Sequence, residues 1–140
     1  MAGFVHDIGK RRVPETLLNR TARADDLTSP ERDLLRSHAA EGEKTLAELG
    51  LPVSPSLLEA VRQHHERFDG TGFPDRLAGT SICLGARVIA LAETYEALTG
   101  WRPYREPSSR EQALEFVREG AASGTYDPKI AEVFLEMMAG

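Results

Sequence analysis

The chain has 140 residues, which is enough for one domain with a single hydrophobic core. Its 41% hydrophobic and 28% charged residues exclude a disordered or fibrous chain, and its net charge of −5 provides no overall cationic surface for a nucleic acid polymer or a membrane. The one cysteine, Cys83, allows no intrachain disulfide, and no apolar run is long enough to cross a bilayer. We therefore expect a cytoplasmic acidic protein in which residues 1–140 form one domain.

Helix-start signals divide the first half of the chain into helix-length segments. Thr28 and Glu31 form a capping box with a proline between them, which predicts one helix from Thr28 to about Leu49. Ser54-Pro55 begins the next helix, which runs toward His65.

Three further helices are expected after a glycine-rich loop that ends at about Leu84. Ser109 and Gln112 form a second capping box, and Asp127-Pro128 begins the last helix. The apolar residues expected to face the core from these helices are Val88, Leu91, Ala92, Tyr95, Leu98, Leu114, Val117, Ile130, Val133, Phe134 and Met137. Because alternating strand patterns are absent, the sequence predicts an all-α fold of about five helices.

The four histidines are the most informative polar residues. His38 lies on the apolar stripe of its helix, where a lone histidine is more often a hydrogen-bonded core residue than a metal ligand, and the same holds for His6. His64 and His65 are adjacent, so on a helix their side chains diverge by ~100°. Both can be buried only near a helix end or around a shared polar centre.

Carboxylates accompany these histidines. Asp7 follows His6 directly, and Glu93 and Glu96 share one face of a helix, where the alternative is a solvated acidic edge. Imidazole together with carboxylate suits iron, manganese, nickel or zinc rather than calcium. The spacing therefore favours a mixed histidine and carboxylate metal site.

Taken in order along the chain, these motifs resemble the HD-GYP family, a branch of the HD-domain metal-dependent phosphohydrolases. His6-Asp7 stands at the HD signature, residues 64–74 resemble the long motif that gives the family its second name, and residues 85–90 and 97–105 match the closing motif. The resemblance covers almost the whole chain. It implies an HD-domain-like helical bundle.

The resemblance implies hydrolysis of the bacterial second messenger cyclic di-GMP, to linear pGpG and/or GMP, by a metal-activated hydroxide. It also implies two divalent metal ions, with iron or manganese preferred over magnesium, nickel or zinc. Diguanylate cyclase (GGDEF) domains are implied as protein partners. Two alternatives stay open: a degenerate module that binds cyclic di-GMP or a signalling partner without turnover, and an HD phosphohydrolase that acts on another nucleotide.

The resemblance also implies roles for individual residues. The implied metal ligands are His6, Asp7, His38, His64, His65 and Glu93. The implied catalytic residues are Asp7 and Lys10. The implied substrate-binding cations, each of which could instead be a solvated surface residue, are Lys10, Arg102 and Arg105. The implied partner loop contains Gly70, Gly72, Phe73 and Pro74, and Phe73 replaces the family's tyrosine.

Two features depart from the family pattern. Glu93 stands where the family has a metal-binding aspartate, and its extra methylene moves the ligand oxygens by about a bond length. Only five residues precede His6, so the family's N-terminal helices, which supply another ligand histidine, are lacking. We therefore expect an N-terminally shortened domain. It is a fragment of a longer protein, a chain that functions in a reduced form, or a homo-oligomer in which a partner chain supplies the missing ligand.

Overall fold

The computed structural model describes residues 2–19, 27–102 and 105–139. The elements, in chain order, are α1 (Ala2–Val5), η1 (Ile8–Arg12), α2 (Glu15–Leu18), α3 (Ser29–Arg36), α4 (His38–Glu48), α5 (Pro55–Gln63), η3 (Gly79–Ser81), α6 (Leu84–Thr99), α7 (Arg110–Ala122) and α8 (Pro128–Ala139). Within these described ranges there is no strand, and five α-helices have nine or more residues. The all-α prediction is confirmed. None of the described helices combines the length and the apolar character needed to cross a lipid bilayer.

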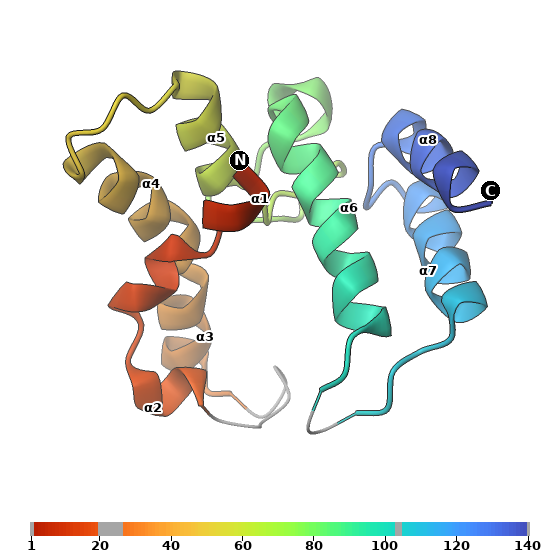
Figure 1. The fold of residues 1–140 in the computed structure, drawn as a ribbon, viewed down its shortest axis with the longest axis horizontal. Coiled ribbons are helices and arrows are strands. Elements are labelled where there is room, and N and C mark those ends of the chain that lie inside the picture. The colour runs from red at the N-terminus through yellow and green to blue at the C-terminus, as the bar shows by residue number, and fades with distance from the viewer. Residues whose placement is uncertain (1, 20–26, 103–104, 140) are drawn as a thin grey trace.

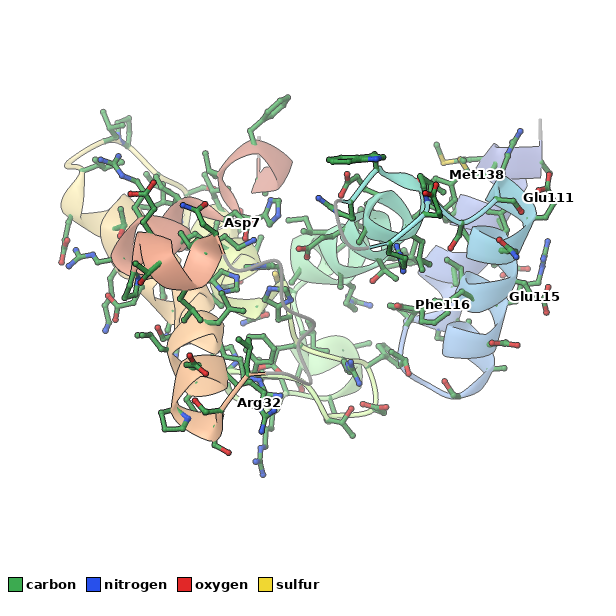
Figure 2. All side chains as sticks on the ribbon, turned by 90° about the horizontal axis from the view of Figure 1, so that it is seen from below. Asp7, Arg32, Glu111, Glu115, Phe116 and Met138 are labelled. Carbon is green, nitrogen blue, oxygen red and sulfur yellow. The ribbon has the colours of Figure 1, made fainter. Side chains whose placement is uncertain are left out.

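Helix α6 stands in the middle of the molecule (Figure 1). The α4–α5 pair and the N-terminal segment lie on one side of it, and α7 and α8 lie on the other. Leu91 of α6, Val117 of α7 and Ala131 of α8 are buried together with Tyr126 in one core cluster. Figure 2 shows Asp7 on the N-terminal side and Phe116 and Met138 on the α7–α8 side. Asp7 therefore lies away from α7 and α8, whereas Thr125 and Tyr126, in the turn between these two helices, line a pocket together with His64 and His65.

Two glycines allow η1 to lie directly against α4. A Cβ atom added at Gly9 would lie 1.9 Å from the carbonyl oxygen of His38 and 2.5 Å from the backbone nitrogen of Gly42. A Cβ atom at Gly42 would in turn lie 2.9 Å from Val61 of α5. Since no side chain fits at this crossing, the close approach of the two backbones holds Asp7 next to His38.

The predicted helix starts are confirmed. Glu31 Oε2 accepts the backbone N–H of Thr28 at 2.8 Å, and the Ser109 hydroxyl accepts the backbone N–H of Gln112 at 3.2 Å. The Ser54 hydroxyl caps α5 in the same way. These side chains satisfy backbone donors that the first turn of a helix leaves unpaired.

The prediction of one helix from Thr28 to about Leu49 is wrong, because the chain forms α3 and α4 with a break at Ser37. The Ser37 hydroxyl donates to the carbonyl of Leu34, and the His38 ring contacts the carbonyl of Leu35. Side chains that bond the last carbonyls of a helix compete with its continuation. The break places His38 at the start of a new helix.

Four residues that were expected to face the core are exposed instead. They are Val88 (46% exposed), Ala92, Val133 and Met137 (75% exposed). Helical periodicity identifies an apolar face, but no described element packs over these positions. On α6 the buried positions include Ala86, Ile89 and Leu91.

Candidate metal centre

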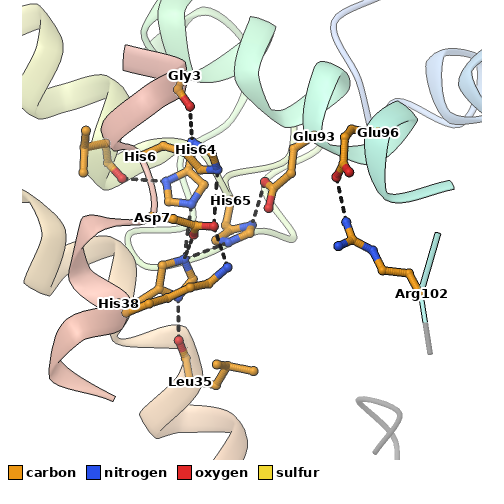
Figure 3. Close-up of polar contacts among 12 residues, drawn as sticks. Gly3, His6, Asp7, Leu35, His38, His64, His65, Glu93, Glu96 and Arg102 are labelled. Carbon is orange, nitrogen blue, oxygen red and sulfur yellow. Dashed lines mark hydrogen bonds and ion pairs between the residues drawn. The ribbon is translucent and has the colours of Figure 1, made fainter. Parts of the chain in front are cut away.

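The four histidines come from three separate parts of the chain and meet in one cluster (Figure 3). His6 follows α1, His38 begins α4, and His64 and His65 follow α5. The ring centroid of His64 lies 5.1 Å from that of His6 and 4.1 Å from that of His65. The adjacent pair is thus accommodated at a helix end and around a shared polar centre, the two conditions inferred from the sequence.

Three of the histidine rings are held by the same contact. In each, Nδ1 faces the carbonyl oxygen of the residue three positions earlier. The pairs are His6 with Gly3 at 2.9 Å, His38 with Leu35 at 2.6 Å and His64 with Val61 at 2.6 Å. Because a carbonyl oxygen can only accept, Nδ1 carries a proton, and in the neutral ring Nε2 then keeps a free lone pair.

The Nε2 atoms of three histidines converge. Nε2 of His38 lies 3.2 Å from Nε2 of His64 and 3.0 Å from Nε2 of His65. Between His38 and His64 no proton is available, so a hydrogen bond cannot form, whereas a cation would satisfy both nitrogens. Metal–nitrogen bonds of about 2.1 Å put neighbouring ligand nitrogens roughly 3.0–3.4 Å apart, which matches these separations.

The carboxylate of Asp7 completes the cluster. Its Oδ1 atom is buried, lies 3.5 Å from His38 Nε2 and has no hydrogen-bond partner among the residues that the structure describes. Its Oδ2 atom accepts from Lys10 Nζ at 2.6 Å and lies 3.5 Å from His6 Nε2. A buried oxygen without a partner is costly, and a bound cation would remove this cost.

Two overlapping sets of potential ligands result. In the described part of the chain, ligand atoms lie within 4.8 Å of one another in the set His38, His64 and His65 and in the set His6, Asp7 and His64. Imidazole nitrogens with a carboxylate oxygen are the donors that divalent first-row metals accept. The residues present therefore fit the metal centre expected from the sequence.

The protonation states also suit metal binding. Burial lowers the pKa of His64 to about 4 and that of His65 to about 2, and it lowers the pKa of His38 as well. Burial alone would raise the pKa of Asp7, but the hydrogen bond and charge of Lys10 bring it below its usual value. At neutral pH His38, His64 and His65 thus offer neutral imidazoles and Asp7 an ionised carboxylate, the forms that bind metals.

Glu93 lies beside the cluster rather than within either set. Its Oε2 atom is 4.0 Å from Nδ1 of His65, the ring nitrogen that points away from His38 (Figure 3). Burial raises the pKa of Glu93, and the nearby charge of Asp7 raises it further. In this arrangement Glu93 contacts the His65 ring from the side opposite His38 and belongs to neither set of potential ligands.

The three cations named from the sequence occupy different positions. Lys10 and Arg102 line one cleft of about 450 Å³ beside Asp7, and Arg102 is held there by Glu96 at 2.6 Å. Arg105 instead donates to the carbonyls at the end of α6 and does not line this cleft. Residues 103 and 104, part of the closing motif, lie outside the described residues.

The glycine-rich loop lies directly against the cluster. The Phe73 ring stacks on His65, with ring centroids 4.8 Å apart and an angle of 27° between the planes. Glu66, which no sequence pattern singled out, is 3% exposed and accepts the backbone N–H groups of Asp75 and Leu77. In the sequence, the position of Glu66 directly after His64 and His65 was the one signal that it could matter to the site.

The family model described as "HD domain" matches residues 1–130. The chain belongs to the HD-domain family. The match includes both the HD signature at His6-Asp7 and the histidines of the cluster. The resemblance to the HD-GYP branch, which was based on the order of these motifs, is confirmed by the curated relatives.

Three of these relatives are phosphodiesterases by name. A cyclic di-GMP phosphodiesterase of Pseudomonas aeruginosa is 37% identical over 136 residues, which cover 97% of this chain and 31% of the relative. The 3'3'-cGAMP-specific phosphodiesterase 1 of Vibrio cholerae is 34% identical, with 96% and 30% covered. A cyclic di-GMP phosphodiesterase of Thermotoga maritima is 30% identical, with 97% and 36% covered. The chain thus spans about a third of the length of these relatives.

Proposed function

We propose that this HD domain, residues 1–140, is the catalytic domain of a metal-dependent phosphodiesterase that hydrolyses cyclic di-GMP. One observation carries the proposal. The lone pairs of His38 and His64 meet at 3.2 Å, beside the buried Oδ1 atom of Asp7, which has no hydrogen-bond partner within the described ranges. The names of the relatives support a cyclic dinucleotide as the substrate class.

The residues of the cluster would hold two divalent ions, iron or manganese. His38, His64 and His65 would hold one ion, and His6 and Glu93 would hold the second. Asp7 could contribute to both, since its Oδ1 atom faces His38 and its Oδ2 atom faces His6. When bound, such ions lower the pKa of coordinated water to give a nucleophilic hydroxide and stabilise charge on the phosphoryl oxygens.

The remaining residues of the chain prepare the cleft for a phosphodiester. Lys10 donates to Asp7, which keeps this carboxylate ionised and oriented. Lys10 and Arg102 line the cleft, where their charges would bind phosphate oxygens, and Glu96 holds the Arg102 side chain in place. The products would be linear pGpG and/or GMP. The contacts of Arg105 favour a role in holding the segment that carries Arg102.

The test is hydrolysis by the purified chain after it has been loaded with Mn²⁺ or, without oxygen, with Fe²⁺. Cyclic di-GMP, 3'3'-cGAMP, cyclic di-AMP and pGpG serve as substrates, with metal content measured on the same samples. We expect cyclic di-GMP turnover that falls at least 100-fold in Asp7→Asn and His38→Ala. Binding without turnover would favour the degenerate module, and turnover of another nucleotide alone would favour the other phosphohydrolase.

Two partners belong to this proposal as well. Phe4 is 95% exposed and Trp101 72% exposed, and covering apolar side chains such as these with a partner would be favourable. A diguanylate cyclase (GGDEF) domain and a second copy of the chain are the proposed partners. Light scattering of the purified chain, alone and with such a domain, checks both, and a monomer in each sample would contradict them.

A further inference from the structure

His65 differs from the other three histidines in how its ring is held. The rings of His6, His38 and His64 each donate Nδ1–H to a carbonyl three residues earlier. His65 makes no such contact among the described residues, and its Nδ1 atom faces Glu93 Oε2 at 4.0 Å, too far for a hydrogen bond (Figure 3). The plane of this ring must therefore be set by other neighbours.

The backbone of residues 70–74 lies directly against the backbone of His65. The N–H of Phe73 donates to the carbonyl of His65 at 3.2 Å. A Cβ atom at Gly72 would lie 2.6 Å from that carbonyl oxygen and 2.3 Å from the backbone nitrogen of Arg67. The glycine thus permits a contact that no other residue would allow.

The end of this loop is tied to the residue that follows His65. The carboxylate of Glu66, 3% exposed, accepts the backbone N–H of Asp75 at 2.6 Å and that of Leu77 at 3.1 Å. A buried carboxylate that accepts two backbone donors is a strong attachment. The loop is therefore fixed relative to His65 at Phe73 and again just after its last residue.

The fixed backbone places the side chain of Phe73 against the His65 ring. Its ring stacks on the His65 ring with centroids 4.8 Å apart and planes inclined by 27°, within the range of favourable aromatic pairs. The guanidinium carbon of Arg36 lies 5.3 Å from the centroid of the same Phe73 ring, close enough for a cation–π contact. Stacking thus supplies for His65 the orientation that a carbonyl supplies for the other three rings.

We propose that Phe73 is a positioning residue for the metal ligand His65, and that residues 70–74 form a support that fixes the plane of its ring. The inference rests on the proposed function, because it takes His65 as a ligand. It gives the glycine-rich motif a role inside the site, independent of any docking partner. Removing a neighbour that orients a metal ligand typically weakens metal binding by about 10- to 100-fold.

The experiment titrates the full chain with Co²⁺ alone and follows the visible absorption of the bound ion, which reports both affinity and ligand geometry. The variants are Phe73→Tyr, Phe73→Leu, His65→Ala and the double variant Phe73→Leu with His65→Ala. Phe116→Leu, which removes a half-exposed ring on α7, is the matched control. Melting temperatures of the metal-free proteins show which variants are folded.

We expect Phe73→Leu to weaken Co²⁺ binding about 10-fold and to alter the spectrum, whereas Phe73→Tyr and Phe116→Leu stay within about 2-fold of the unchanged protein. In the His65→Ala background, Phe73→Leu should cause no further loss. An equal loss with and without His65, or no loss at all, would overturn the positioning role. If Phe73→Leu does not fold, Phe73→Met, which also lacks the ring, takes its place in the same cycle, with the same expected loss of about 10-fold.

Failure of the unchanged chain to bind Co²⁺ would be a different result. It would overturn the proposed metal centre itself, and the positioning role together with it. Normal Co²⁺ binding that is insensitive to the ring at position 73 would instead overturn the positioning role alone.

Discussion

Asp7 and His38 face each other through atoms that cannot bond to one another. Oδ1 of Asp7 is buried and lies 3.5 Å from Nε2 of His38. The proton of the neutral His38 ring is on the other nitrogen, Nδ1, which donates to the carbonyl of Leu35. Two lone pairs thus meet without a donor between them. Such an arrangement opposes folding, and a cation at this point would reverse the effect.

Metal should therefore stabilise the fold strongly. At 100 times its dissociation constant, a ligand that binds only the folded state adds about 2.7 kcal/mol to the free energy of unfolding, which corresponds to a rise in Tm of about 10 °C here. We expect this rise when Mn²⁺ is added to chelator-treated protein, measured by circular dichroism. In Asp7→Ala most of the rise should disappear, and an unchanged Tm in the original chain would contradict the prediction.

The crossing of η1 and α4 should not tolerate a methyl group. Gly9→Ala would place Cβ 1.9 Å from the His38 carbonyl oxygen, so we expect a loss of about 1–3 kcal/mol in the free energy of unfolding and a loss of bound metal. Gly3→Ala is the matched control, since nothing lies within 4 Å of its Cβ position. Urea unfolding and metal analysis compare the two, and equal behaviour would be evidence against the close approach.

The metal-free protein should lose stability in mild acid. Because the pKa of His64 is about 4 in the folded state and 6.5 ordinarily, the unfolded chain takes up a proton below pH 6.5 that the folded chain does not. The free energy of unfolding should fall by up to about 1.4 kcal/mol per pH unit for each such histidine. This decline begins at about pH 6.5 and, for His64, ends near pH 4.

Urea unfolding in a chelator at pH 7.5, 6.5, 5.5 and 5 measures this slope above the range where most carboxylates titrate. His64→Gln should give a shallower dependence on pH than the unchanged chain. A stability that stays constant between pH 6.5 and 5 would show that these rings are protonated as easily in the folded state as in the unfolded one.

How far the sequence predicted the fold depended on the local signals. Capping side chains at Thr28, Ser54 and Ser109 gave correct helix starts because a cap is decided within one turn. The break at Ser37 has no glycine or proline to mark it, since it depends on side chains that bond carbonyls of α3. The exposure of Val88 depends on which elements pack nearby, and periodicity carries no information about that.

For the site, too, the sequence predicted some features and missed others. The residue types indicated a histidine and carboxylate centre, but spacing along the chain could not bring His6, His38 and His64 together, and only the resemblance did so. The carbonyl contacts of these rings were missed because they use backbone atoms that every residue possesses. The role of Glu66 was missed because its partners are backbone N–H groups of a loop.

Glu93 and Glu96 should separate metal binding from substrate binding. Glu93→Gln removes a partly buried carboxylate beside His65, so we expect the affinity for Mn²⁺ to fall about 10-fold. Glu96→Gln, three residues away, should leave metal affinity unchanged and raise KM, because it releases Arg102. Calorimetric titration with Mn²⁺ and steady-state kinetics on cyclic di-GMP make the comparison, and equal effects on metal affinity would refute it.

The carbonyl groups that hold three of the histidine rings have a consequence for local motion. They belong to Gly3 in α1, Leu35 in the last turn of α3 and Val61 near the end of α5, and helix ends are where a chain normally frays. If an ion fixes the rings, it also fixes these last turns. The amide hydrogens that close the three helix ends would then exchange with solvent deuterium only as fast as the ion leaves, so that separate helix ends open and close together.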